Sequence, residues 1–332
     1  MKRKLQILCL LLLAIQGMKA QVPKKVLVEH FSNTNCSICA NRNPAFYANY
    51  NMQSNALHLA IHPSAPYPNC LLSQQSSPQN DARTNHYGIY GGTPRLVING
   101  TVISTGANYG ASSIFTPFVG QTSPASIRIV QEKFGMDSIV ALISVKTEAV
   151  HTLGNLVLFV ALSEDTVNYT GGNGETAHFD VFRKALTDAT GTPFTLPATV
   201  GDSMVFRVSS AADPIWDFSR IYTMAVVQEA GNKVLVQAAA AAPGENGSTT
   251  GVTSGLGQIE VYPNPTENLV HVRLPNASSC EITILNHLGQ TVARQKHATQ
   301  SFDINLSTLP SAKYWLQVRT PNGSLTKPIV KL

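Results

Sequence analysis

The 332-residue sequence predicts an α+β multidomain protein in which strands predominate. Three observations indicate this class. Strand-like and helix-like stretches are mixed as far as residue 122, β-rich runs continue to residue 240, and short strands return after residue 258. We therefore expect an α/β domain, then an antiparallel β-sandwich, and then a small C-terminal β-sandwich.

The first twenty residues predict a secretory signal peptide. Lys2, Arg3 and Lys4 precede the apolar run 5–15, and Ala20 offers a small residue at a cleavage point. The alternative, a membrane anchor, would need a longer apolar run. We expect the mature chain to start near Gln21, to be exported through the inner membrane, and to contain no transmembrane segment.

Removal of this peptide takes away most of the basic character of the chain. The sequence has 24 Lys and Arg against 19 Asp and Glu, and four basic residues but no acidic ones lie in 1–20, which leaves 20 against 19. A net charge of +1 gives no reason to expect nucleic acid or an anionic membrane as partner. Four cysteines remain, too few for a disulfide scaffold: Cys36, Cys39, Cys70 and Cys280.

Composition sets the expected boundaries of the mature chain. The segment 241–257 is rich in Ala, Gly, Ser and Thr and has almost no large apolar residue, so it predicts a flexible linker. We expect an α/β domain over 21–122, a β-sandwich over 123–240, and a separate module over 258–332.

Two cysteines follow the first strong strand signal. "KKVLVEHF" (24–31) predicts a strand, and "CSICANRNPAFYANYN" (36–51) predicts a helix that begins at Cys36. Free N–H groups and the helix dipole stabilise a thiolate at that position, and the thiolate is the reactive form in disulfide exchange. Cys39, one turn further on, is placed to resolve a mixed disulfide, and Pro44 is expected to kink the helix.

A proline-containing loop follows later in the same segment. In "YGIYGGTPRLVINGT" (87–101), Thr93–Pro94 opens a β-rich run, which fits a cis peptide bond. With the strand, the CxxC and Pro44, this arrangement resembles the thioredoxin superfamily. The resemblance implies a thioredoxin-like α/β domain in which Cys36 attacks, Cys39 resolves, and Thr93 and Pro94 form an edge where an extended substrate docks.

Several residues depart from that superfamily. Asn35 stands where an aromatic residue often precedes the first cysteine, and Ser37–Ile38 replaces Gly-Pro. His30 occupies the position of the buried acid. One interpretation makes His30 the acceptor of the Cys39 proton, and the other makes it a strand histidine satisfied by its neighbours.

The insertion before the proline loop carries His62 and Cys70. Together with Cys36 and Cys39 they could form a Cys₃His zinc site, but the irregular spacing favours a simple loop, with Cys70 as a buried residue or a third thiol. His58 and His62 share one face of a strand, where we expect polar residues at a loop edge. We therefore assign no metal and no cofactor.

The stretch 25–240 is similar to the outer-membrane-protein-28 family. The similarity is carried by "VLVEHFSNTNCSICANRNP", "HFDVFRKALTDATGTPF" and "YTMAVVQEAGNKVLVQAA". It implies a secreted or surface protein of a Gram-negative bacterium, with a β-sandwich after a redox-like domain. The biochemical activity of that family is poorly defined, so the similarity bears on architecture more than on reaction.

The C-terminal module resembles the sorting domain of the type IX secretion pathway. The matching elements over 258–332 are "YPNP" (262–265), "LGQ" (288–290), "INLS" (304–307) and the Lys-containing β end. The resemblance implies a small β-sandwich that the type IX secretion machinery reads as an address to the cell surface, outer membrane or medium. A carbohydrate-binding or adhesive β-domain is the alternative, but the module has no evident aromatic platform.

Two functions remain open from the sequence. The first is thiol–disulfide exchange through Cys36 and Cys39 on a protein disulfide substrate, with reducing equivalents from a partner and no cofactor. The second is a non-enzymatic surface or binding protein in which the disulfide Cys36–Cys39 is structural.

Overall fold

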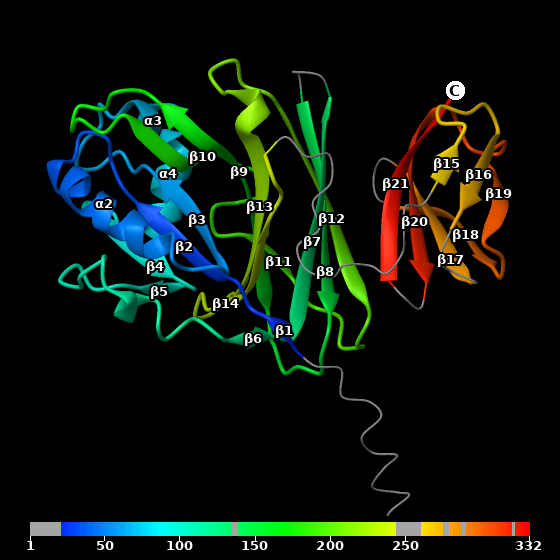
Figure 1. The fold of residues 1–332 in the computed structure, drawn as a ribbon, viewed down its shortest axis with the longest axis horizontal. Coiled ribbons are helices and arrows are strands. Elements are labelled where there is room, and N and C mark those ends of the chain that lie inside the picture. The colour runs from blue at the N-terminus through cyan, green and yellow to red at the C-terminus, as the bar shows by residue number, and fades with distance from the viewer. Residues whose placement is uncertain (1–20, 135–137, 244–259, 275–278, 287–289, 321–322) are drawn as a thin grey trace, which may run out of the picture. The chain divides into compact units, whose positions relative to one another are not determined.

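The structure, a computed structural model, describes residues 21–134, 138–243, 260–274, 279–286, 290–320 and 323–332. The predicted signal peptide, most of the predicted linker, and Leu288–Gly289 of the predicted turn in the sorting domain lie outside these residues. The chain divides into two compact units, Met1–Thr250 and Gly251–Leu332 (Figure 1).

The first unit contains few helices and many strands. Its helices are α2 (Ser37–Tyr50), α3 (Leu71–Gln74) and α4 (Ser77–His86). Its first strands are β1 (Val22–Pro23), β2 (Val26–Phe31), β3 (Ala56–Ile61), β4 (Arg95–Ile98), β5 (Thr101–Val102), β6 (Thr122–Ser123) and β7 (Ala125–Phe134). The others are β8 (Ser138–Thr147), β9 (Leu156–Asn168), β10 (Ala177–Ala185), β11 (Thr192–Phe194), β12 (Ser203–Ala211), β13 (Ile221–Glu229) and β14 (Leu235–Ala240).

One nine-stranded mixed sheet runs through this unit. Its strand order is β14-β13-β9-β10-β3-β2-β4-β5, and β11 joins by pairing with β9. The β2–β3 and β3–β10 pairs are parallel, whereas β9–β10, β9–β13 and β2–β4 are antiparallel. The sheet therefore combines strands from both segments for which the sequence predicts separate folds.

This sheet corrects the predicted fold class. Of the residues that the structure describes, 47% lie in strands and 12% in helices, spread over several sheets. The prediction of a thioredoxin-like α/β domain followed by a separate antiparallel sandwich is wrong, because β3 pairs with β10 and the hydrogen-bonded ladder continues into β9, β13 and β14. Local patterns predict strands but do not determine which distant strand will pair with an exposed edge.

Burial on both faces explains why β9 lies inside the sheet. Its run "LVLFVALS" is buried at every position, as expected for a strand covered on two sides. Phe159 and Ala161 belong to a core shared with β2, β3, β4, β13 and β14. Leu158 and Val160 pack on the other side, against a core that includes the three-stranded sheet β12-β8-β7.

Strand β2 has a different cover on each face. Val26 and Val28 pack against Phe46 of α2, whereas Leu27 and Phe31 face the core beneath the large sheet. On that second face Glu29 accepts hydrogen bonds from the buried guanidinium of Arg83 in α4, at 2.6 and 3.1 Å. The alternation of side chains along the strand thus places His30 under α2 and Glu29 under α4.

The second unit contains two sheets around one core. One sheet has the strand order β15 (Glu260–Tyr262), β16 (Leu269–Arg273), β19 (Ser301–Asn305). It faces a second sheet with the order β18 (Thr291–His297), β17 (Cys280–Leu285), β20 (Ala312–Thr320), β21 (Gly323–Lys331). Val272, Ile282 and Leu316 are fully buried between the sheets. This arrangement agrees with the small C-terminal β-sandwich that the sequence predicts, and Cys280 is one of its buried core residues.

The buried pair of Arg83 and Glu29 provides a test of this fold. Arg83→Met would leave the Glu29 carboxylate buried without its cation, so we expect the free energy of unfolding of the first unit to fall by about 3–5 kcal/mol in urea titrations. Arg220→Met removes an arginine whose side chain is 41% exposed, and we expect it to lower the free energy of unfolding by only about 0–1 kcal/mol. Equal losses in the two variants would contradict the role assigned to the buried pair.

Candidate functional site

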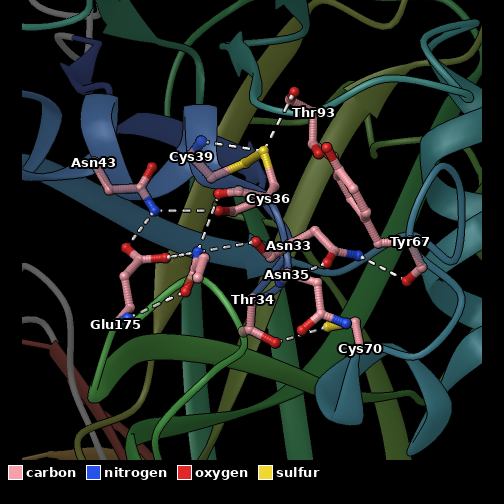
Figure 2. Close-up of a disulfide and its surroundings, with 12 residues drawn as sticks. Asn33, Thr34, Asn35, Cys36, Cys39, Asn43, Tyr67, Cys70, Thr93 and Glu175 are labelled. Carbon is pink, nitrogen blue, oxygen red and sulfur yellow. Dashed lines mark hydrogen bonds between the residues drawn. A yellow bond between two sulfur atoms is a disulfide. The ribbon is translucent and has the colours of Figure 1, made fainter.

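The Cys36–Cys39 turn lies at the start of α2, immediately after strand β2. Cys36 is the N-cap of the helix, and the backbone N–H of Cys39 donates to Cys36 Sγ at 3.1 Å. The two sulfurs form a disulfide with the Cα atoms 5.2 Å apart (Figure 2). The predicted helix start at Cys36 is thus confirmed.

The proline loop predicted from the sequence lies against this disulfide. The Thr93–Pro94 peptide bond is cis, and the carbonyl oxygen of Thr93 is 3.6 Å from Cys36 Sγ (Figure 2). The structure therefore brings Cys36, Cys39, Thr93 and Pro94 together.

A second loop, 169–175, holds the backbone of the cysteine turn. This β9–β10 connection places the Asn173 side-chain amide so that it donates to the carbonyl oxygens of Asn33 and Cys36, at 3.3 and 3.1 Å. The backbone N–H of Asn173 donates to the carbonyl of Thr34 at 2.9 Å. Glu175 accepts a hydrogen bond from Asn43 of α2 at 2.8 Å and thereby fixes the loop to the helix as well (Figure 2).

Sequence reasoning missed this loop, although one signal was present. A Cβ atom added to Gly171 would lie 2.7 Å from the carbonyl oxygen of Thr34, and one added to Gly172 would lie 2.5 Å from Asn35 Oδ1. A side chain at 171 would collide with the backbone of the turn, and one at 172 would have to displace the Asn35 side chain. Close approach to the cysteine turn therefore explains Gly171 and Gly172 of the "GGNG" run, whereas Gly174 has a positive φ of 89°.

Both sulfur-bearing residues of the site are buried. Cys36 and Cys39 are each 0% exposed, whereas Ser37 and Ile38 between them are exposed. An external thiolate reaches either sulfur only after a covering segment moves. The Thr93 carbonyl is one such cover, and it follows two glycines, of which Gly91 has a positive φ of 98°.

His30 lies under α2 and is completely buried. Its ring centroid is 4.6 Å from that of Phe46, and its Nδ1 lies 3.4 Å from Nε2 of His58. Among the described residues, its Nε2 has no hydrogen-bond partner of normal geometry. Burial, followed by the neighbouring His58 and His62, lowers the pKa of His30 well below its usual value.

The environment of His58 and His62 differs from the expected loop edge. Both side chains are buried, and His58 Nδ1 lies 3.0 Å from Asp180 Oδ2 of strand β10. Burial is also the largest cause that lowers the pKa of His62. Neither partner of His58 could be predicted from local sequence, because each lies on a different strand.

The third cysteine is a buried thiol beside the turn. Cys70 precedes α3, and its Sγ lies 3.2 Å from the hydroxyl of Thr34, which also contacts the hydroxyl of Tyr169. In Figure 2, Thr34 and Asn35 separate Cys70 from the disulfide. Within the described ranges, no group of three or more His, Cys, Asp or Glu side chains is arranged to hold a metal ion.

The second unit contains a Ser–His–Asp hydrogen-bond chain. His271 Nδ1 lies 2.7 Å from Asp303 Oδ1, and His271 Nε2 lies 2.7 Å from Ser301 Oγ. The histidine and aspartate side chains are 34% and 54% exposed, and the serine is exposed too. Acyl transfer requires a site that excludes water and carries oxyanion donors, so we assign this chain to cross-strand pairing between β16 and β19.

Comparison with known proteins identifies the second unit. Residues 260–332 match the family described as "Secretion system C-terminal sorting domain". The chain therefore carries a type IX sorting domain, which engages the type IX secretion machinery. It is exported to the cell surface, outer membrane or medium.

Two solved structures from Porphyromonas gingivalis are similar to the chain. HBP35 is 17% identical with a TM-score of 0.57, and the match covers 95% of this chain and 100% of HBP35, which shows a shared fold. A domain of the outer membrane lipoprotein Omp28 is 17% identical with a TM-score of 0.28 over 36% of this chain and 86% of that domain. No curated protein matches the chain. In the part of the chain that the structure describes, no helix is long and apolar enough to cross a bilayer.

The buried histidines predict a loss of stability in acid. His30 and His62 have pKa values held well below 6.5, and burial lowers the pKa of His86 to about 4. As the pH falls through about 6.5, these histidines take up protons in the unfolded chain but not in the folded one. The free energy of unfolding is therefore highest above that pH and decreases below it. His30 and His62, which are fully buried, each add a slope of about 1.4 kcal/mol per pH unit, and the partly exposed His86 adds less because solvent screens its charge.

Urea titrations at pH 7, 6 and 5 measure this slope. We expect His62→Gln to reduce this slope by about 1.4 kcal/mol per pH unit, which is the contribution of one bound proton. A free energy of unfolding that stays constant between pH 7 and pH 5 would contradict the account.

Proposed function

We propose that the exported protein catalyses thiol–disulfide exchange through Cys36 and Cys39. The observation that carries this proposal is the placement of Cys36 Sγ at the N-terminus of α2, where it accepts the backbone N–H of Cys39 at 3.1 Å. The same donor and the helix dipole would stabilise a Cys36 thiolate after reduction.

The proposed reaction balances without a cofactor. In the reduced protein the Cys36 thiolate attacks a substrate disulfide, forms a mixed disulfide and releases one substrate thiolate. Cys39 then loses its proton and attacks Cys36 Sγ, which releases the second substrate sulfur. The substrate gains two electrons, and the protein is left with the Cys36–Cys39 disulfide, which an external dithiol would reduce again.

The proline loop would align the substrate in this reaction. The Thr93 carbonyl lies 3.6 Å from Cys36 Sγ, so a chain that pairs with the backbone at Thr93 would bring its own sulfur to Cys36. Because this carbonyl also covers the sulfur, substrate would have to displace residues 91–93 to form that pairing. Pro94 itself is buried and would stay in place.

A structural disulfide is the second candidate, and burial favours it. Both sulfur-bearing residues are 0% exposed, and Asn173 and Glu175 hold the turn through hydrogen bonds to its backbone and to Asn43. On this account the bond would restrict the unfolded chain, and the surface role would belong to other parts of the protein.

Insulin reduction separates the two candidates. The mature protein should accelerate insulin reduction by dithiothreitol, and Cys36→Ser should lower the rate to that of dithiothreitol alone. Cys70→Ser removes a thiol beside the turn and should leave the rate unchanged. Equal rates for the mature protein, for Cys36→Ser and for dithiothreitol alone would leave the structural disulfide as the function of the pair.

A further inference from the structure

We propose that Arg95, together with Arg42, makes the exchange site selective for disulfides that carry carboxylates close to their sulfurs. This selectivity rests on the proposed exchange reaction, because it concerns how a substrate approaches the sulfur of Cys36. It adds no chemical step to that reaction and names the class of substrate that the reaction takes.

Arg95 follows the proline loop that covers Cys36. Its guanidinium lies over Gly92, because a Cβ atom added to Gly92 would be 3.4 Å from Nη2 and 3.7 Å from Nε of Arg95. The next residue, Thr93, has its carbonyl oxygen 3.6 Å from Cys36 Sγ. Arg95 and Gly92 are both partly exposed. A substrate that displaces residues 91–93 therefore meets this guanidinium as it reaches the sulfur.

Arg42 of α2 places a second guanidinium in the same region. Its Cζ lies 3.7 Å from the Tyr109 ring centroid, and its Nη1 donates to the carbonyl oxygen of Thr105 at 2.9 Å. Burial raises the pKa of Tyr109, and the positive charges of Arg42 and Arg95 oppose that shift, so both guanidinium groups lie near this ring. Arg42 also comes one helical turn after Ile38, and it therefore shares a face of α2 with the exposed residue between the two cysteines.

Neither guanidinium group forms an ion pair with a carboxylate of the residues that the structure describes. The sequence gives a reason, because the acidic residues of 21–122 are Glu29 and Asp81 alone. Glu29 binds the buried Arg83, and Asp81 accepts the backbone N–H of Ser64 at 2.7 Å. The two guanidinium groups therefore keep a positive charge that a ligand can neutralise.

The carboxylate of Glu175 approaches the cysteine turn from a different side. It accepts hydrogen bonds from Asn43 at 2.8 Å and from Asn173 at 2.6 Å. Figure 2 shows it across the turn from Thr93. The electrostatic potential is therefore positive on the side of the proline loop, and the N-terminal end of the α2 dipole adds to it.

A positive potential at this place favours anionic substrates over cationic ones. The Debye length is about 30 Å at 0.01 M ionic strength and about 8 Å at 0.15 M, so at low salt both arginines act on a disulfide before it makes contact. Such attraction raises the association rate. A carboxylate that reaches the Arg95 guanidinium also gains charge-assisted hydrogen bonds. The expected substrate is therefore a disulfide in an acidic protein segment.

Three small disulfides of similar length test this selectivity. The mature protein is reduced, freed of reductant, and mixed with 3,3′-dithiodipropionate, bis(2-hydroxyethyl) disulfide or cystamine, which are anionic, neutral and cationic at pH 7. In each reaction the Cys36 thiolate attacks one sulfur and releases half of the probe as a thiolate, and Cys39 then releases the other half. Two electrons pass to the probe. Acid quenching and mass spectrometry follow the formation of the Cys36–Cys39 disulfide.

The rate for each probe is divided by the rate at which dithiothreitol reduces the same probe, which corrects for differences in intrinsic reactivity. At an ionic strength of about 0.01 M we expect the corrected rate to be about tenfold higher for the anionic probe than for the cationic one. Arg95→Met should lower this ratio about threefold or more, whereas Arg95→Lys keeps the charge and should retain most of it. Addition of NaCl to about 0.5 M should bring the ratio close to one, because salt screens the exposed charges.

A matched control removes the same charge elsewhere in the first unit. Arg207 is an exposed residue of β12, at the other end of that unit from α2, and Arg207→Met should leave the ratio unchanged (Figure 1). A ratio near one in the unaltered protein, or a ratio that Arg95→Met and Arg207→Met lower equally, would overturn the selectivity. Absence of reaction with all three probes would overturn the proposed function, and the selectivity with it.

Discussion

The parallel pairing of β10 with β3 is the constraint on which the rest of the first unit depends. It joins strands that lie more than a hundred residues apart, at the register Val181 to Ala60. The same pairing places the 169–175 loop against the cysteine turn, and it places Asp180 beside His58. The cysteine turn is thus completed by a part of the chain that belongs to a different predicted domain.

Buried polar groups give this arrangement its specificity. The Arg83 guanidinium donates to Glu29, Tyr87 and Gln228 and lies 4.0 Å from the Phe159 ring centroid. A shift in the register of β2 would break these contacts on its α4 side. On the α2 side, the contacts of His58 with His30 and Asp180 form only if β3 lies between β2 and β10. Polar groups that lose a partner in a low-dielectric interior are costly, and both networks therefore disfavour alternative strand pairings.

The sequence carried the local features of the site but not its long-range ones. The helix start at Cys36, the cis bond at Thr93–Pro94 and the short strands of the C-terminal module follow from residue types and their spacing. The merged sheet, the contact of Asn173 with the turn and the burial of His58 do not, because each depends on a pairing between distant segments. The glycines at 171 and 172 were the only local sign of that contact, and such a run also fits an ordinary loop.

In the proposed reaction the Cys36–Cys39 bond opens and closes within the folded protein, and a count of free thiols can show whether it does. Native secreted protein, quenched in acid and then alkylated in denaturant, should show the two free thiols of the buried Cys70 and Cys280. After mild dithiothreitol that leaves the circular dichroism spectrum unchanged, and the same quench, we expect Cys36 and Cys39 to be alkylated as well. If dithiothreitol reduces the bond only once the first unit is unfolded, the bond is a fixed crosslink and the proposed exchange reaction is wrong.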